Sequence, residues 1–195
     1  MNLRLPALFP KSPLRRGIVA VGLVVLAWMH LATPALAALK VGQPAPDFTA
    51  PASLAGKPFE FHLAEALKKG PVVLYFYPAA FTKGCTVEAH LFAEASDDFA
   101  ALGATVIGVS GDDIDTLHRF SVSECRSKFA VAADPDLKIA RAYDAKLPLL
   151  GAADRTSFLI LPDASIGFVH SAMSPDRHVS STLAALRAWK AGPAR

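Results

Sequence analysis

The sequence predicts an α/β domain, because short apolar runs alternate along the chain with longer amphipathic stretches. Residues 71–77, PVVLYFY, are apolar without alternation, which is typical of a strand covered on both faces. Residues 104–109, ATVIGV, form a second such run. Between them apolar side chains recur every three or four residues, so we expect one crossover helix over residues 85–102. A strand, a helix and a strand in this order predict a right-handed parallel unit.

The other elements are predicted from the same periodicities and from turn residues, and residues 42–48 are expected to be irregular. They are an edge strand over 57–63, a helix over 113–129 with Cys125 near its far end, a short helix over 137–143, strands over 157–161 and 166–170, and a closing helix over 179–189. Turn residues at 162–165 predict that the last two strands form a hairpin, which makes the central sheet mixed and flanked by helices.

The first 37 residues have the pattern of an export signal. Basic residues without an acidic one lead into a nearly wholly apolar run over residues 17–29, and Ala35-Leu36-Ala37 offers the small side chains of a signal peptidase site. We expect cleavage after Ala37, a single domain over residues 38–195, and export, to the periplasm if the host has two membranes. Export through the twin-arginine route at Arg15-Arg16, and a retained membrane anchor, are the alternatives.

The charge balance excludes a nucleic-acid partner. The formal net charge of the whole chain is +3, and loss of the four basic residues of the predicted signal, Arg4, Lys11, Arg15 and Arg16, brings it to −1. The remaining basic residues are interspersed with acidic ones and form no long run. We therefore expect neither nucleic-acid binding nor, once the signal is removed, membrane association.

Cys85 lies where a predicted strand has ended and a helix begins. Backbone N–H groups in the first turn of a helix have no intrahelical partner and carry partial positive charge, so this position favours a thiolate nucleophile. The second cysteine, Cys125, is expected to meet Cys85 in a disulfide at some stage, because an exported protein encounters oxidising conditions. A permanent bond would contribute roughly 4 kcal/mol, so both a structural and a cycling disulfide are open. The absence of a C-x-x-C pair argues against a thioredoxin-type oxidoreductase.

Four segments, taken together, resemble the peroxiredoxins, and in particular their Q-type, bacterioferritin-comigratory-like branch. They are Val41-Gly42-Gln43-Pro44-Ala45-Pro46-Asp47-Phe48, the P-x-x-x-T-x-x-C spacing of Pro78, Thr82 and Cys85, the continuation Gly84-Cys85-Thr86-Val87-Glu88, and Arg155-Thr156-Ser157-Phe158-Leu159-Ile160. The resemblance implies a thioredoxin-like fold and a thiol peroxidase that reduces hydrogen peroxide and organic hydroperoxides. It also implies a thioredoxin-like protein as reductant, a monomer, and no metal or other cofactor.

The residues fit this chemistry. A thiolate attacks one peroxide oxygen while negative charge builds on the other, so the site must ionise sulfur and stabilise the leaving oxygen. Cys85 supplies the nucleophile, and Arg155 would favour the thiolate and polarise the peroxide. The Thr82 hydroxyl is placed to hydrogen-bond the sulfur or the substrate, and rigid Pro78 can wall the pocket. Taken singly, Arg155 also fits as a surface cation, Thr82 as a helix N-cap and Pro78 as a strand terminator. An active-site role for Glu88, one turn into the helix, is left undecided.

The sequence departs from the branch at one point. Many Q-type members carry a resolving cysteine five residues after the first, and here that position is His90. Cys125 resembles the arrangement in which the resolving cysteine lies on the next helix; the alternative is a buried Cys125 with an external thiol resolving Cys85. Two other functions stay open: a non-catalytic binding module with a permanent disulfide, and a glutathione-peroxidase-like enzyme that glutathione reduces directly.

Overall fold

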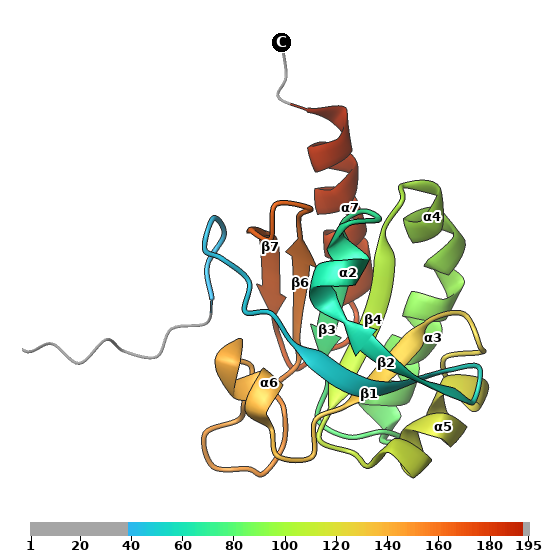
Figure 1. The fold of residues 1–195 in the computed structure, drawn as a ribbon. Helices are drawn as coiled ribbons and strands as arrows, with labels where there is room; N and C mark the ends of the chain where they lie inside the picture. Colours follow the sequence, from blue (N-terminus) through green and yellow to red (C-terminus); the bar gives the residue numbers. More distant parts are fainter. Residues whose placement is uncertain (1–38, 193–195) are drawn as a thin grey trace, which may run out of the picture. The chain divides into compact units, whose positions relative to one another are not determined.

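The computed structural model describes residues 39–192, and they form a seven-stranded mixed sheet with helices on both faces (Figure 1). The strand order is β2-β1-β5-β4-β3-β6-β7. The strands are β1 Thr49–Leu54, β2 Lys57–His62, β3 Val72–Phe76, β4 Thr105–Ser110, β5 Ala130–Ala133, β6 Thr156–Ile160 and β7 Ile166–Ser171. The helices are α2 Leu63–Leu67, α3 Lys83–Glu94, α4 Ser96–Ala101, α5 Ile114–Ser123, α6 Lys138–Ala142 and α7 His178–Ala191.

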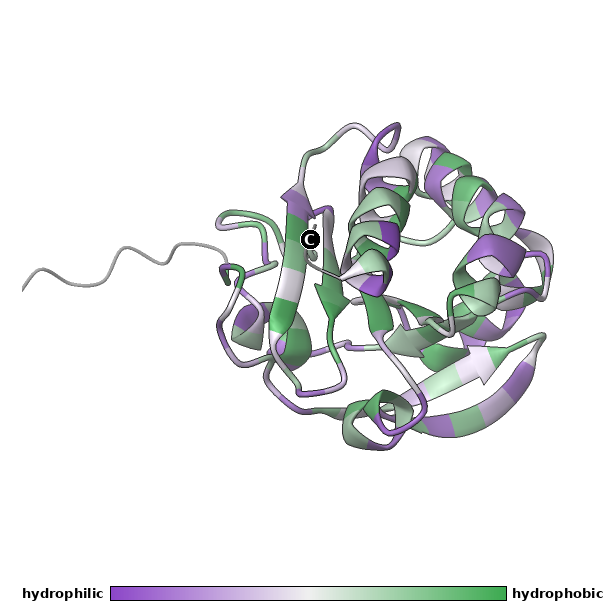
Figure 2. Cartoon of the chain, turned by 90° about the horizontal axis from the view of Figure 1, so that it is seen from above, coloured by the Kyte–Doolittle hydropathy of each residue, from purple (hydrophilic) through white to green (hydrophobic). Residues whose placement is uncertain are grey.

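The central strands are buried on both faces because their side chains alternate between two hydrophobic clusters. In β3, Leu74 and Phe76 pack toward α2 and α6, while Val73 and Tyr75 pack toward α3, α4, α5 and α7. β3 pairs with β4 in parallel and with β6 in antiparallel orientation, so the middle of the sheet has no polar face. Hydrophobic residues run along these strands in Figure 2, and the helices present hydrophilic residues outward. The result is a three-layer α/β/α domain.

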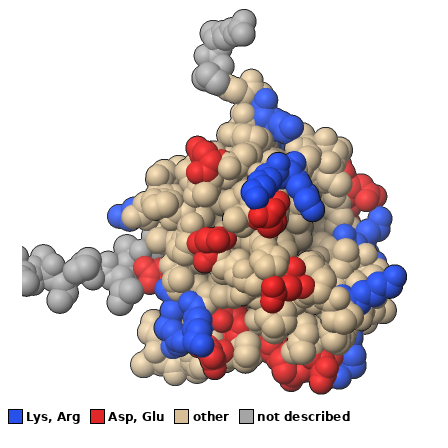
Figure 3. Space-filling view, viewed as in Figure 1, with Lys and Arg blue, Asp and Glu red and all other residues tan. Residues whose placement is uncertain are grey.

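The predicted core of the fold is confirmed. The parallel β3–helix–β4 unit, the short helix near residue 140, the hairpin of β6 and β7, the closing helix and the edge strand β2 all occur at or near the expected residues. No helix within residues 39–192 is long and apolar enough to cross a membrane. On the face drawn in Figure 3, acidic and basic side chains are interspersed. The predicted export signal, residues 1–37, lies outside the described residues.

Two predicted helices differ from the structure. The crossover helix is divided at Ala95 into α3 and α4, where the Ser96 side chain donates to the carbonyl of Phe92. The helix over residues 113–129 ends at Ser123, so Cys125 lies in the following loop and not on a helix. Arg126 and Ser127 adopt positive φ angles of 50° and 57°, a conformation that no helix continues through.

Three elements were not predicted, and the reasons are visible in their sequences. β5 is the segment AVAA, whose small side chains carry little strand signal, although all four residues are buried. β1 contains Pro51, which normally argues against a strand between two neighbours. It is tolerated because β5 pairs only with Ala52 and Ser53. α2 is too short for a helical periodicity to show.

Candidate active site

Cys85 occupies the first turn of α3, one loop after β3. Thr82 is the N-cap residue in an extended conformation, φ −75° and ψ 148°, and α3 begins at Lys83. Phe81 has a φ of 61°, so the loop turns sharply just before the helix. The thiol is free, and Cys85 is 2% exposed. The sulfur therefore combines a helix N-terminus with nearly complete burial.

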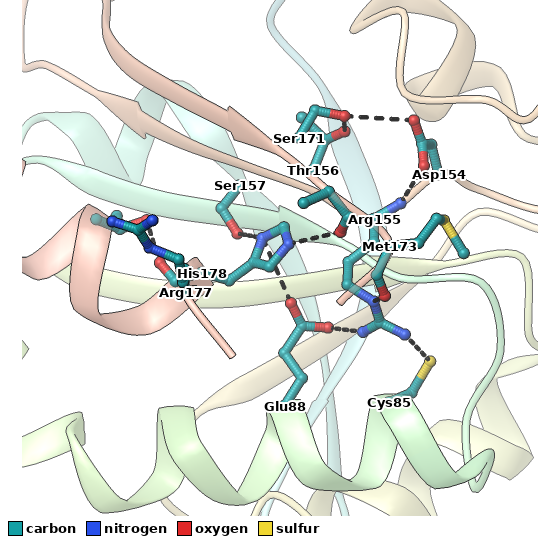
Figure 4. A network of polar contacts seen from close by, with 12 residues as sticks. Cys85, Glu88, Asp154, Arg155, Thr156, Ser157, Ser171, Met173, Arg177 and His178 are labelled. Carbon is teal, nitrogen blue, oxygen red and sulfur yellow. Dashed lines mark hydrogen bonds and ion pairs between the residues drawn. The ribbon is translucent and has the colours of Figure 1, made fainter. Parts of the chain in front are cut away.

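Arg155 is brought to Cys85 by strand pairing. It immediately precedes β6, and Thr156 pairs with Phe76, the last residue of β3, so the two strand ends meet beside the start of α3. Its Nη2 donates to Cys85 Sγ at 3.4 Å, its Nε donates to the carbonyl of Met173 at 2.9 Å, and its Nη1 donates to Glu88 Oε2 (Figure 4). Arg155 is 4% exposed, so this positive charge acts on the sulfur with little screening by water.

Glu88 is a buried partner of Arg155, one helical turn after Cys85. Residues at i and i+3 lie on the same face of a helix, which places the carboxylate and the sulfur under one guanidinium (Figure 4). Burial raises the pKa of Glu88 to about 7, and the charge and hydrogen bond of Arg155 oppose this rise only in part. Burial alone would lower the pKa of Arg155, but Glu88 and Cys85 together raise it above its ordinary value. The guanidinium is permanently charged.

His178 completes the buried network from the start of α7. It is 0% exposed, its Nε2 lies 2.8 Å from the carbonyl oxygen of Ala172, and its Nδ1 lies 2.8 Å from Ser157 Oγ. The same Nδ1 lies 3.6 Å from Glu88 Oε1 (Figure 4). Burial lowers the pKa of His178 to about 4, so the imidazole is neutral at ordinary pH.

Thr82 and Pro78 lie in the loop between β3 and α3. The Thr82 hydroxyl donates to the carbonyl of Ala79 at 2.9 Å, and the side chain is exposed. This bond shapes the loop before Cys85 and does not reach the sulfur in this structure. Pro78 follows the buried Tyr77 directly and is half-buried. The loop is also fixed from outside, because the backbone N–H of Ala80 donates to Asp112 Oδ2 at 2.7 Å.

Cys125 is the other thiol, and it is also free and buried. Burial is the main cause that raises its pKa well above the ordinary range of a thiol, and the neighbouring charge of Glu124 adds to the effect. Both cysteines belong to the same hydrophobic cluster, on the face of the sheet covered by α3, α5 and α7. Cys125 is therefore a poor nucleophile while it stays buried, in contrast to the Arg155-bound sulfur of Cys85.

Sequence reasoning brought together Cys85 and Arg155 correctly but left Glu88 undecided and missed His178. The signal for Glu88 was its spacing of three residues from Cys85, which puts both side chains on one helix face. No local signal existed for His178. It reaches the site only because α7 packs back against β6, more than ninety positions after Cys85 along the chain.

The chain matches a family model, curated relatives and solved structures. The model described as "AhpC/TSA family" matches residues 41–169. The chain belongs to this family. A Mycobacterium tuberculosis protein assigned to the peroxiredoxins is 35% identical over 158 residues, which cover 79% of this chain and 100% of that protein. The chloroplastic peroxiredoxin Q of Arabidopsis thaliana is 33% identical over 149 residues, covering 75% and 67% of the two chains.

The solved structures agree with the fold. The crystal structure of the peroxidoxin BcpB from Mycobacterium tuberculosis matches with a TM-score of 0.71 and 33% identity, covering 80% of this chain and 99% of that one. Reduced Plasmodium vivax 2-Cys peroxiredoxin matches with a TM-score of 0.71 at 24% identity, covering 78% and 83%, and supports the fold alone. The chain is thus a peroxiredoxin with a thioredoxin-like fold, similar to the Q-type branch, and a thiol peroxidase. A non-catalytic binding module is not favoured.

Proposed function

We propose that Cys85 is the peroxidatic residue of this thiol peroxidase. The observation that carries the proposal is the buried Cys85 sulfur in the first turn of α3, with Arg155 Nη2 at 3.4 Å. The thiolate attacks one oxygen of a hydroperoxide, an S–O bond forms as the O–O bond breaks, and the departing oxygen takes up a proton. Water or an alcohol leaves, and Cys85 becomes a sulfenic acid. Arg155 stabilises the charge on the sulfur before attack and on the leaving oxygen afterwards.

Pro78 and Thr82 complete the pocket in this proposal. Pro78 walls the approach to the sulfur and offers no N–H to compete for the peroxide. The Thr82 hydroxyl lies one turn before Cys85 and bonds a loop carbonyl, Ala79 O, so a rotation about its χ1 angle would release it toward a bound peroxide. Hydrogen peroxide and organic hydroperoxides are the proposed substrates. The chemistry uses sulfur alone and requires no flavin or metal.

Cys125 is the proposed resolving residue. Its thiol attacks the Cys85 sulfenic acid, a disulfide forms, and water leaves. Both sulfurs are buried and free, so disulfide formation requires that α3 and the loop after α5 open locally. A thioredoxin-like protein then reduces the disulfide. We further propose that the enzyme acts as a monomer, and that it is exported by the signal over residues 1–37, to the periplasm of a two-membrane host.

The test compares the reduced protein with Cys85→Ser and Cys125→Ser by stopped-flow with hydrogen peroxide, followed by mass spectrometry. Rapid peroxide consumption that Cys85→Ser abolishes is expected. The intact protein should end as a Cys85–Cys125 disulfide, and Cys125→Ser should end with Cys85 as a sulfinic acid. Slow consumption that is indifferent to Cys85 would refute the assignment, and a Cys125→Ser protein that still turns over with an added thioredoxin would exclude Cys125 as the resolving residue.

The reductant is tested on the oxidised protein. A thioredoxin-like protein is expected to regenerate both thiols at low concentration, whereas glutathione alone is expected to be slow. Direct and rapid reduction by glutathione would instead support the glutathione-peroxidase-like mechanism. Export is tested by measuring the mass of the protein recovered from the host: a chain that begins at Ala38 supports it, and a chain that retains residues 1–37 contradicts it.

A further inference from the structure

The buried network of Cys85, Glu88, Arg155 and His178 contains one carboxylate oxygen, Glu88 Oε1, without a hydrogen-bond partner among residues 39–192. Glu88 Oε1 is buried and accepts no hydrogen bond within the described part of the chain, although Glu88 Oε2 is bound by Arg155. A buried carboxylate oxygen without a hydrogen-bond donor costs free energy, so the ionised form of Glu88 is disfavoured at Oε1. On that side His178 Nδ1 lies 3.6 Å from Glu88 Oε1.

The hydrogen bonds of His178 fix which of its nitrogens carries a proton. A carbonyl oxygen can only accept, so the 2.8 Å contact with Ala172 O requires a proton on Nε2. The neutral imidazole then has a lone pair on Nδ1, and Ser157 donates its hydroxyl proton to that lone pair at 2.8 Å. Nδ1 therefore presents negative charge density toward Glu88 Oε1. An ionised Glu88 Oε1, 3.6 Å away, is repelled there, whereas a protonated and therefore neutral carboxyl is not.

Arg155 faces two acids at once, and they compete for its charge. With Cys85 as a thiolate and Glu88 as a carboxylate, one guanidinium would balance two negative charges in a site where all three side chains are at most 4% exposed. With a proton on Glu88, the same site is neutral and Arg155 is free to serve the sulfur. The ionisation of Cys85 is thus favoured by any group that keeps the proton on Glu88.

We propose that His178 is a positioning residue of the peroxidatic centre: the partial negative charge of its unprotonated Nδ1 favours a proton on Glu88 Oε1 and so leaves the Arg155 charge to the Cys85 thiolate. The inference rests on the proposed role of Cys85 and goes beyond it. The raised pKa of Glu88 and the lowered pKa of His178, about 7 and about 4, agree with a proton that resides on the carboxyl side of the pair.

The titratable and charged groups around Glu88 and His178 come from α3, β3, the start of β6, β7 and α7. Glu88 faces Cys85 on its own helix, Arg155 at the start of β6, His178 on α7 and the neutral phenol of Tyr75 on β3. His178 is approached in addition by His170 on β7, whose ring centroid lies 4.7 Å away. Asp154 and Arg155 also influence His178 through their charges. Of these groups, His178 is the one that places an unprotonated ring nitrogen 3.6 Å from Glu88 Oε1.

The test separates the two nitrogens of His178. His178→Gln can still donate from the ε position to Ala172 O but has no acceptor at the δ position, and His178→Asn keeps an acceptor there and loses the donor. Both are made in a Cys125→Ser background, and the single-turnover rate with hydrogen peroxide is followed from about pH 5 to about pH 9. His178→Gln is expected to move the pH midpoint of the rate upward by about one unit, a loss of about tenfold below the midpoint. His178→Asn is expected to recover most of that loss.

Three comparisons decide the result. His170→Gln changes a neighbouring, half-buried histidine that forms no ion pair or hydrogen bond with Glu88 in the described part of the chain; it is the matched control and should leave the midpoint in place. In a Glu88→Gln background, whose amide mimics the protonated carboxyl, His178→Gln should cause no further shift. Equal losses in His178→Gln and His178→Asn, or a His178→Gln shift that persists in the Glu88→Gln background, would overturn the proposal.

Two safeguards keep the test decisive. If His178→Gln does not fold, as judged by circular dichroism, Glu88→Gln carries the test, because the proposal requires its midpoint to lie at or below that of the parent protein. A midpoint above the parent's would refute it. A parent protein that does not react with peroxide through Cys85 would refute the proposed function, whereas a reactive parent with an unmoved His178→Gln midpoint would refute this inference alone.

Discussion

At the scale of single residues, each guanidinium nitrogen of Arg155 donates one hydrogen bond within the site. The three guanidinium nitrogens bind two segments that are far apart in the sequence: α3, at Cys85 and Glu88, and the loop after β7, at Met173. A lysine could supply the charge but not this planar set of donors. The position of the guanidinium over the sulfur therefore depends on groups that touch it from every side.

Gly84 is one of these groups, and it yields a prediction about reactivity. A Cβ on Gly84 would lie 3.1 Å from Arg155 Nη2, closer than ordinary contact. Gly84→Ala should therefore displace the guanidinium from Cys85 and slow the reaction with peroxide by several-fold, on the order of 1 kcal/mol of lost stabilisation. The folded state should be no less stable, because alanine favours a helix over glycine by about 0.5–1 kcal/mol.

The measurement pairs stopped-flow kinetics with urea unfolding. Gly151→Ala is the matched control, because a Cβ on Gly151 would meet nothing within 4 Å. A Gly84→Ala protein that reacts at the parent rate would show that the position of the guanidinium is not critical.

At the scale of elements, the segment that carries Cys125 is tied to α3, which carries Cys85, and to α4, which follows it. Three side-chain contacts join alternate residues of the segment to α3 and α4: a hydrogen bond of Glu124 with His90 at 2.9 Å, and ion pairs of Arg126 with Glu94 at 3.2 Å and of Lys128 with Asp97 at 3.2 Å. His90 occupies the position where many Q-type members carry a cysteine, and here it holds the loop of Cys125 instead. We name these pairs the 124–128 latch.

The latch predicts a faster resolving step when it is weakened. Partly exposed polar side-chain contacts contribute about 0.2–1 kcal/mol each, so Glu124→Gln, which weakens the half-buried contact with His90, should favour the opened segment by up to about fivefold. If Cys125 resolves Cys85, Glu124→Gln forms the disulfide faster after a peroxide pulse and yields less sulfinic acid, as quenching and mass spectrometry would show. Lys138→Gln, which breaks the surface pair with Asp136 elsewhere, is the control. An unchanged rate in Glu124→Gln would mean that the latch does not limit opening.

At the scale of the whole molecule, burial favours the neutral forms of Glu88 and His178, which ionise more readily in the unfolded chain. The free energy of unfolding therefore depends on pH. The pKa of Glu88 is raised from 4.5 to about 7 by burial. The folded protein thus keeps a proton that the unfolded chain releases in this interval. The contribution of Glu88 is fully present below pH 4.5 and is lost as pH rises through about 7.

Glu88→Gln removes this dependence. The difference in free energy of unfolding between the parent protein and Glu88→Gln should fall by up to about 3 kcal/mol as pH rises across that window. Urea unfolding at several pH values measures it. The lowered pKa of His178 acts in the opposite sense, since its stability is lost as pH falls from 6.5 through about 4. His178 is present in both proteins, so this term largely cancels. A difference that is flat in pH would show that folding does not raise the pKa of Glu88.

The sequence by itself determined the elements with strong periodicity and the place of Cys85 at the start of a helix. Non-alternating apolar runs identified β3 and β4, and the strand-to-helix junction identified Cys85, because these signals arise within a few consecutive residues. It also gave Arg155, through the segment that resembles the family. It failed where the signal was weak or misleading, in the alanine-rich β5 and in the helix that was extended past Ser123 to include Cys125.

Only the tertiary structure decided how the site is assembled. The pairing of Thr156 with Phe76 places Arg155 over Cys85, and the packing of α7 places His178 behind Glu88. These contacts join segments separated by about seventy positions and more, as with Arg155 and Cys85. Local propensity carries no information about such pairs, because burial and the loss of water that set the charges of Glu88 and His178 exist only once the layers have packed.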